Sequence, residues 1–169
     1  GRSTSFKLNN PQTYLTKKSC FTNHIRVWKK CIELDESVAF IEQDSHCIRK
    51  WDFPSFDELL VLNIQSAFKQ PVFSHVKNKP YNFEFGVKDY SDSPLIYNKS
   101  NSFYGSLMIP GTAAYAISPR GAKRLLDNLE KHGWDQSDFF INTKNVRIQY
   151  VYPEYFTFKY PNLNMSHGF

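Results

Sequence analysis

The sequence predicts a single small α/β domain in which helices flank a mixed sheet, and three features indicate this. A segment with the apolar period of a helix is followed directly by a short, almost wholly apolar run at 37–41. A second helix is strongly signalled at 118–131, and further short apolar runs lie between and after these segments. The chain has 169 residues, 41% of them hydrophobic, which suits one domain with its own core.

The first helix is predicted over 19–34, after a polar, turn-rich N-terminal arm at 1–18. Its apolar residues are spaced by four, three and four positions, as on one face of a helix: Phe21, Ile25, Trp28 and Ile32. The polar residues at 35–37 end it. The run at 37–41 then predicts a strand buried on both faces, as in a parallel sheet. Glu42, Gln43 and Asp44 follow at its carboxyl end, where open α/β sheets bind ligands.

The middle of the chain is less regular. A second buried strand is predicted over 58–64, after a possible helix start at Pro54 and Ser55. Residues 65–102 predict an irregular insertion with short strands that lines a cleft. Two further strands, at 103–109 and 113–117, are expected around a turn at 110–111.

The second helix has the clearest local signals. Ser118 is a typical N-cap, Pro119 suits the first helical position, and Gly133 is a typical C-terminal stop. The stripe expected to face the core is Ala122, Leu125, Leu126 and Leu129. A short helix at 137–142 and a strand at 146–151 follow. The predicted organisation is therefore an arm at 1–18, an α/β domain at 19–152 and a C-terminal tail at 153–169 that packs on or near the site.

Charge and cysteine content narrow the class of protein. The formal charge is +5, but the basic residues are dispersed. They form either a solvated surface or a field that attracts an anion such as a nucleotide diphosphate, a lipid-linked phosphate or DNA. Three cysteines without a CxxC pair argue against a metal cluster or a disulfide framework, and favour reduced thiols in the cytoplasm. No apolar stretch is long enough to predict a membrane span.

The acidic triplet at 42–44 is the leading candidate for chemistry. Glu42 and Asp44 are separated by one residue, so that they can serve a divalent cation and a ribose hydroxyl together. Sugar-nucleotide transfer needs such a cation to neutralise the diphosphate that leaves. The alternative is an ordinary charged turn. Motifs of P-loop, dinucleotide-binding, zincin and nucleophile-elbow proteins are absent from the sequence.

Four other residues are candidates, each with a structural alternative. His24 is either a ligand-binding residue or a structural histidine of the first helix. Asp135 and Asp138 follow the second helix, and either can act as a general base or cap the next helix. His167 is either a late metal ligand or a residue of the tail.

Two ordered blocks resemble glycosyltransferase family 25. Residues 20–28 and 38–44 are similar to its Ser-His pair on a helix, tryptophan four residues on, and apolar strand ending in Glu-Asp-Asp. His24 and Trp28 match, whereas Asn23 replaces the serine and Gln43 replaces the middle acid. Residues 111–126 resemble the family pattern G-T-x-x-Y-x-I-S-x-x-G-A-x-x-L-L. The family's later aspartate is best matched by Asp138, with Asp135 the second choice.

The resemblance implies a GT-A-type fold with a Rossmann-like sheet, and transfer of a sugar from a nucleotide sugar to an acceptor hydroxyl with Mn²⁺ or Mg²⁺. The acceptor would be a glycan, a lipid-linked molecule or a protein. Asp44 would bind the metal, with Glu42 on the ribose or the metal; His24 and Thr112 would contact the donor. Asp138 would be the base or an acceptor-site residue.

Two other functions are carried forward. Family members begin with a strand and helix for the nucleotide base, but here residues 1–18 precede the His24 helix. The chain is therefore expected to be a fragment, a minimal enzyme, or a catalytically impaired module that binds a glycan or a partner. Alternatively, the acceptor is a nucleic-acid base, which the basic charge and the many aromatic residues would suit.

Overall fold

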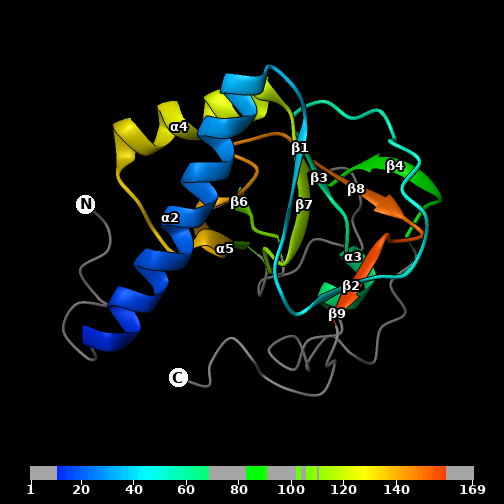
Figure 1. Ribbon diagram of the computed structural model, residues 1–169, viewed down its shortest axis with the longest axis horizontal. Helices are drawn as coiled ribbons and strands as arrows, with labels where there is room; N and C mark the ends of the chain where they lie inside the picture. Colours follow the sequence, from blue (N-terminus) through cyan, green and yellow to red (C-terminus); the bar gives the residue numbers. More distant parts are fainter. Residues whose placement is uncertain (1–10, 69–82, 91–101, 104–105, 110, 159–169) are drawn as a thin grey trace.

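A five-stranded mixed sheet lies at the centre of the computed structural model, which describes residues 11–68, 83–90, 102–103, 106–109 and 111–158 (Figure 1). The strand order across the sheet is β1 (Val38–Ile41), β7 (Ala114–Ile117), β3 (Leu59–Val61), β8 (Ile148–Tyr152) and β4 (Gly86–Asp89). Helices flank the sheet, so the predicted single α/β domain with a mixed sheet is confirmed, and this arrangement is consistent with the expected GT-A-like fold.

The strand directions bring several chain segments to one edge of the sheet. Strands β1 and β3 both run antiparallel to β7, and β3 runs parallel to β8. The carboxyl ends of β1, β3 and β8 therefore meet at one edge, together with the amino end of β7. Residues that follow β1 and residues that precede β7 become neighbours there, although about 70 residues separate them in the sequence.

Strand β1 differs from its prediction, because it is not buried on both faces. Among the described residues it pairs only with β7, so it is an edge strand of the sheet. Val38 and Phe40 pack against the core, whereas Ala39 and Ile41 are exposed. An apolar run is compatible with both arrangements, since the sequence alone does not say what covers the second face.

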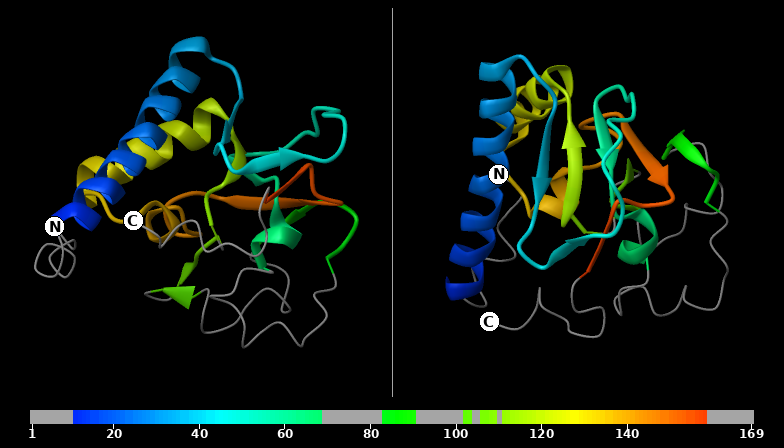
Figure 2. Two further views of the ribbon diagram at one scale, coloured as in Figure 1. Left: turned by 60° about the horizontal axis from the view of Figure 1, so that its bottom comes forward. Right: turned by 45° about the vertical axis from the view of Figure 1, so that its right-hand side comes forward.

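Helices α2 (Pro11–Leu34) and α4 (Pro119–His132) pack against each other on one face of the sheet (Figure 2). Helix α2 begins at Pro11, so the predicted arm at 1–18 is wrong for residues 11–18. Tyr14 explains part of this extension, because its ring contacts that of Trp134 at a centroid distance of 5.3 Å. The buried stripe also differs from the predicted one, since Ile32 is exposed; the buried residues of α2 are Phe21, His24, Trp28 and Cys31.

The prediction for α4 is confirmed at both ends. The Ser118 Oγ accepts a hydrogen bond from Gly121 N at 3.2 Å, and it donates to the Asp57 carbonyl at 2.7 Å. At the other end, Gly133 N donates to the Leu129 carbonyl at 2.9 Å. These bonds satisfy backbone groups that a helix leaves unpaired at its ends, and they join α4 to the segment before β3.

The remaining elements correct several predicted boundaries. The predicted strand at 58–64 is shorter, because α3 (Ile64–Phe68) starts within it. Strand β6 (Ser106–Leu107) pairs with β5 (Ser102–Phe103), so the strands expected at 103–109 and 113–117 do not form a hairpin. The helix expected at 137–142 is α5 (Ser137–Phe140). Part of the predicted tail is a strand, β9 (Phe156–Phe158), which pairs with β2 (Ser45–Cys47).

Hydrophobic clusters cover both faces of the sheet. The larger cluster lies between the sheet and α2 and α4, and it includes the buried Trp28, Tyr115 and Leu125. The smaller one lies on the opposite face, where Tyr155 and the partly buried Trp51 cover Leu60, Leu62 and Val151. Within the described part of the chain, no helix combines the length and apolar character needed to cross a membrane.

Candidate functional site

The acidic segment 42–44 is held at the carboxyl edge of the sheet by the chain that precedes β7. Glu42 N donates to the Ala113 carbonyl at 2.8 Å. Ser45 N donates to the Glu42 carbonyl at 3.0 Å, and the Ser45 hydroxyl donates to the Ala113 carbonyl at 3.1 Å. These bonds form a tight turn directly after β1 and fix the direction in which its side chains leave the sheet.

Three carboxyl groups from two distant segments influence one another at this turn. Burial, and then the negative charges of Asp44 and Asp138, raise the pKa of Glu42 from 4.5 to about 7. Asp138 belongs to α5, which packs against α2. One carboxylate oxygen of Asp44, Oδ1, is buried and has no hydrogen-bond partner. The turn and α5 therefore place excess negative charge together, as a cation-binding site does.

A hydrogen-bonded aromatic cluster supports this edge from the side of α2. His24 is 1% exposed, and its ring stacks on Phe40 of β1 at a centroid distance of 4.0 Å. The Tyr115 hydroxyl accepts a hydrogen bond from Trp28 Nε1 at 3.0 Å and lies 2.8 Å from His24 Nδ1. Burial raises the pKa of Tyr115. The cluster joins α2, β1 and β7. Its β1 member, Phe40, lies two residues before Glu42, where the acidic turn begins.

The protonation of His24 follows from these contacts. Burial lowers the pKa of His24 from 6.5 to about 4, so the ring is neutral at pH 7. Among the described residues His24 Nδ1 is the acceptor within reach of the Tyr115 hydroxyl hydrogen, which favours donation from Tyr115 to His24 Nδ1 while the same oxygen accepts from Trp28. The ring hydrogen of His24 is then on Nε2, which is buried without a hydrogen-bond partner. In this tautomer His24 carries a neutral, buried N–H without a hydrogen-bond partner among the described residues.

Lys17 and Cys20 also face the carboxylates, although the sequence did not single them out. Lys17 Nζ donates to Gln136 Oε1 at 2.7 Å, and the charges of Asp138 and Asp135 oppose the lowering of the Lys17 pKa by burial. Burial, followed by the charge of Glu42, raises the pKa of Cys20. Lys17 and Cys20 precede His24 by helical spacings of seven and four; Cys20 lies within the predicted helix, and an earlier helix start would have included Lys17 as well.

The other predicted residues occupy different places. Thr112 is buried, and its Oγ1 lies 3.4 Å from the Ser137 Oγ at the start of α5. Asp135 Oδ1 accepts a hydrogen bond from Gln136 N at 2.7 Å just before α5, but the N-cap residue of α5 is Gln136 and not Asp135. His167 lies outside the described residues. The fold therefore brings Glu42, Asp44 and Asp138 together and places His24 and Thr112 on the elements beside them.

The residues at this turn can supply only part of the coordination shell of a divalent cation. Within the described ranges, no group of three or more His, Cys, Asp and Glu side chains is arranged to hold a metal ion. Glu42 and Asp44 supply two carboxylates, and Asp44 has an unpartnered buried oxygen. Mg²⁺ and similar ions commonly take one or two protein carboxylates and complete their shell with substrate phosphates and water. The donor set fits that mode.

The raised pKa of Glu42 leads to a test by pH. With chelator present, Glu42→Gln is expected to gain about 3 kcal/mol of unfolding free energy relative to wild type between pH 5 and pH 8. Below pH 4.5, Glu42 is neutral in both folded and unfolded chains. As the pH rises to about 7, only the unfolded chain loses its proton freely, so wild type loses stability. Urea unfolding at both pH values measures the difference.

The pH dependence of wild-type stability alone would not reveal the contribution of Glu42. The lowered pKa of His24 gives a slope of opposite sign between about pH 4.5 and 6.5, because there the unfolded chain binds the extra proton. Comparison with the variant isolates Glu42. Glu130→Gln, on the exposed side of α4, is the matched control and should show no pH-dependent difference. An equal difference between Glu42→Gln and wild type at both pH values would contradict the environment described for Glu42.

Comparison with known proteins yields one match. The family described as "Glycosyltransferase family 25 (LPS biosynthesis protein)" matches residues 4–141 of the chain. The matched range includes α2, the acidic turn, Thr112 and Asp138, and it ends before β8. No curated protein and no solved structure matches the chain.

Proposed function

Because the chain belongs to glycosyltransferase family 25, we propose that it transfers a sugar from a nucleotide sugar to an acceptor hydroxyl at the edge formed by Glu42, Asp44 and Asp138. The observation that carries this proposal is that Asp44 and Asp138 lie close enough to the buried Glu42 to act on it: burial, and then their negative charges, raise the pKa of Glu42 to about 7. A structural surface turn would leave them apart in solvent. Perturbed carboxyl groups from separate segments are typical of functional sites.

The donor binds beside the acidic turn. Glu42 and Asp44 would hold Mn²⁺ or Mg²⁺, with His167 as a further ligand. The cation neutralises the charge of the leaving nucleotide diphosphate when it is bound. His24 directs its Nε2 hydrogen at a donor oxygen, and Thr112 contacts the donor from the start of β7. The neutral state of His24 at pH 7 lets it bind an oxygen without adding a charge.

Asp138 acts on the acceptor. Its carboxylate takes the proton of the acceptor hydroxyl while the oxygen forms a bond to the anomeric carbon. The bond from that carbon to the diphosphate breaks, and its electron pair leaves with the diphosphate. The Lys17 ammonium interacts with Asp138 and so places a positive charge beside this carboxylate. Asp135 is the second choice for the base, although its Oδ1 already accepts from Gln136 N.

The acceptor proposed is a glycan, a lipid-linked molecule or a protein hydroxyl. The described arginines near α4 do not favour a nucleic-acid base as the acceptor. The Arg120, Arg124 and Arg147 side chains pair with acidic groups, among them the buried Glu58, and so are not arranged for phosphates. The binding-module hypothesis predicts glycan affinity without nucleotide affinity, and the same assay tests it.

Thermal unfolding with a panel of UDP-, GDP- and CMP-sugars, each with Mn²⁺ and with EDTA, tests the proposal. A donor at 100 times its Kd is expected to stabilise the fold by about 2.7 kcal/mol, which raises Tm by about 5–10 °C for a chain of this size. The shift should occur for one nucleotide class, and only with the metal. If no donor shifts the Tm of well-folded protein, the transferase proposal fails for this chain.

A further inference from the structure

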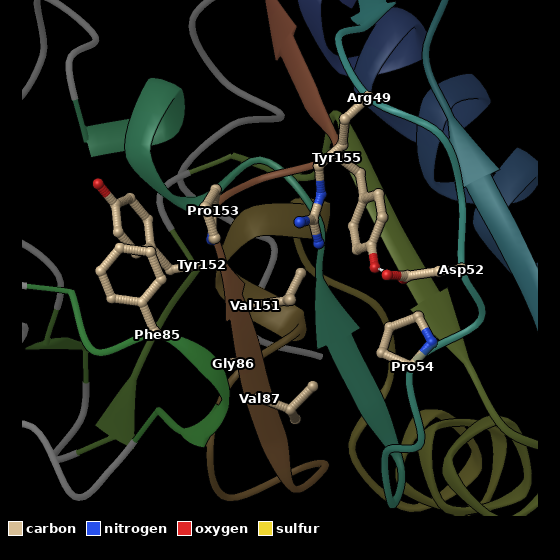
Figure 3. Close-up of a pocket in the computed structure, with 10 residues that line it drawn as sticks. All are labelled: Arg49, Asp52, Pro54, Phe85, Gly86, Val87, Val151, Tyr152, Pro153 and Tyr155. Carbon is tan, nitrogen blue, oxygen red and sulfur yellow. Dashed lines mark hydrogen bonds between the residues drawn. The ribbon is translucent and has the colours of Figure 1, made fainter.

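Apart from the acidic turn, a pocket of about 370 Å³ lies on the sheet face opposite α2 and α4, over β8 and β4 (Figure 3). Its volume is within the range of small-molecule sites. Val87 and Val151 form its floor, and the segment that follows β2 contributes Arg49 and Asp52. None of these residues belongs to the acidic turn, and nothing in the proposed transfer step uses them.

Arg49 provides an unpaired positive charge in this pocket. Its guanidinium lies over the ring of Tyr155, 3.7 Å from the ring centroid. Its Nε is buried without a hydrogen-bond partner, and no described residue forms an ion pair with it. The neighbouring carboxylate of Asp52 instead accepts a hydrogen bond from the Tyr155 hydroxyl. A guanidinium that is partly desolvated and lacks an anion is a ready site for a carboxylate or a phosphate.

Aromatic rings supply the rest of the recognition surface. Phe85 is 74% exposed and packs edge-on against Tyr152 at a centroid distance of 5.2 Å. Figure 3 shows these two rings on one side of the valine floor and Arg49 with Tyr155 on the other. Tyr152 itself packs against the larger cluster on the α2 and α4 face, whereas the exposed ring of Phe85 at the pocket rim can contact a ligand with an apolar face. The pyranose ring of a sugar has such a face, and its hydroxyls can donate to Asp52.

The topology places this pocket within reach of the acidic turn. Tyr152 ends β8, and β8 runs parallel to β1, which leads to Glu42. Strands β7 and β3 lie between them, so the two strands are about 14 Å apart at a spacing of about 4.8 Å per strand. An extended ligand can therefore occupy the pocket with one end and approach the turn around the sheet edge with the other.

We propose that this pocket binds a sugar residue that carries one negative charge, a carboxylate or a phosphate, within a saccharide acceptor. Arg49 pairs with the anionic group, Phe85 contacts the ring, and Asp52 accepts from a hydroxyl. A single guanidinium beside a carboxylate matches one charge; a nucleic-acid strand would need a row of cations along its phosphates. The acceptor role rests on the proposed transferase function, whereas the binding itself does not.

Ligand-observed NMR titration in EDTA, without nucleotide sugar, tests the binding. The probes are a disaccharide ending in glucuronate, the same disaccharide ending in glucose, a disaccharide phosphate, inorganic phosphate and a single-stranded oligonucleotide. The two anionic saccharides are expected to bind at least 10-fold more tightly than the neutral one and than inorganic phosphate. Arg49→Gln should weaken them by about 10- to 100-fold and leave the neutral disaccharide unchanged. The ratio between glucuronate and phosphate shows which anion is preferred.

Three variants keep the result interpretable. Phe85→Ala should weaken charged and neutral disaccharides alike, because it removes a ring contact; it is exposed, so the fold should tolerate it. Arg26→Gln, on the exposed side of α2, should change nothing. Asp44→Asn should bind like wild type, which separates this site from the acidic turn. The proposal is overturned if the anionic saccharides fail to bind folded wild type, if Arg49→Gln binds them equally well, or if inorganic phosphate or a single-stranded oligonucleotide binds as tightly.

Discussion

Asp44→Asn is expected to lower kcat/KM for sugar transfer by about 1,000-fold while the fold stays intact. A bound divalent cation contributes several kcal/mol to stabilising charge in a transition state, and about 4 kcal/mol corresponds to this factor. Asn has the shape of Asp but lacks its charge, so it is a poor replacement for a metal-binding carboxylate. The Oδ1 atom has no hydrogen-bond partner to lose. The measurement is steady-state transfer with the donor that the thermal panel identifies.

Stability should change in the opposite direction from activity. Asp44 is one of the charges that raise the pKa of Glu42, so its removal relieves repulsion and leaves metal-free stability equal or higher. Asp127→Asn is the control, because Asp127 is exposed on α4 and pairs with Lys123. It should keep wild-type turnover. Unchanged turnover in Asp44→Asn would remove Asp44 from the site, and a large loss of stability would show that the residue is structural.

Gly121→Ala is expected to destabilise the fold by about 3 kcal/mol, although alanine is the better helix former. In an ordinary helix this change gains up to about 1 kcal/mol. Here a Cβ at position 121 would lie 2.3 Å from the backbone oxygen of Glu58 and 2.8 Å from its carbonyl carbon. Both are backbone atoms next to β3, so α4 must shift, and such overpacking costs about 1–3 kcal/mol or more. The overlap therefore outweighs the helix propensity.

The shift would also weaken bonds that join α4 to β3. The same Glu58 oxygen accepts from Ser118 N at 2.9 Å, and the buried Glu58 carboxylate pairs with Arg120 and Arg124. For a chain of this size, 3 kcal/mol lowers Tm by about 6–12 °C, which calorimetry resolves. Lys131→Ala, at an exposed position of α4, should stay within about 0.5 kcal/mol of wild type. Equal or higher stability of Gly121→Ala would contradict the close packing of α4 on β3.

Local signals predicted α4 most accurately. An N-cap serine, a proline at the first position and a stopping glycine act through neighbouring backbone atoms, and the structure shows the corresponding bonds. The start of α2 was missed because residues 11–18 lack an apolar period. They are held partly by the contact of Tyr14 with Trp134, which is more than 100 residues away. Such contacts leave no mark in the local sequence.

At the candidate site, the sequence alone identified the acidic residues and predicted that their turn follows a strand. Glu42 and Asp44 were found because they directly follow an apolar strand, and motif resemblance selected the family that the chain belongs to. The roles of these residues remain predictions. The sequence did not reveal that Asp138 influences Glu42, nor that Lys17 interacts with Asp138. Lys17 belongs to α2, Glu42 to the turn after β1 and Asp138 to α5, so these neighbours come from separate elements.

The sequence by itself determined the α/β class, the helix ends with local caps and the acidic turn, because short-range backbone bonds and apolar periods set these features. Only the tertiary structure decided that β1 lies at the side of the sheet, that Tyr115 joins His24 and Trp28, and that Arg49 and Phe85 share a pocket. Strand order and long-range packing depend on which surfaces the whole chain can bury together, and no local window of sequence contains that information.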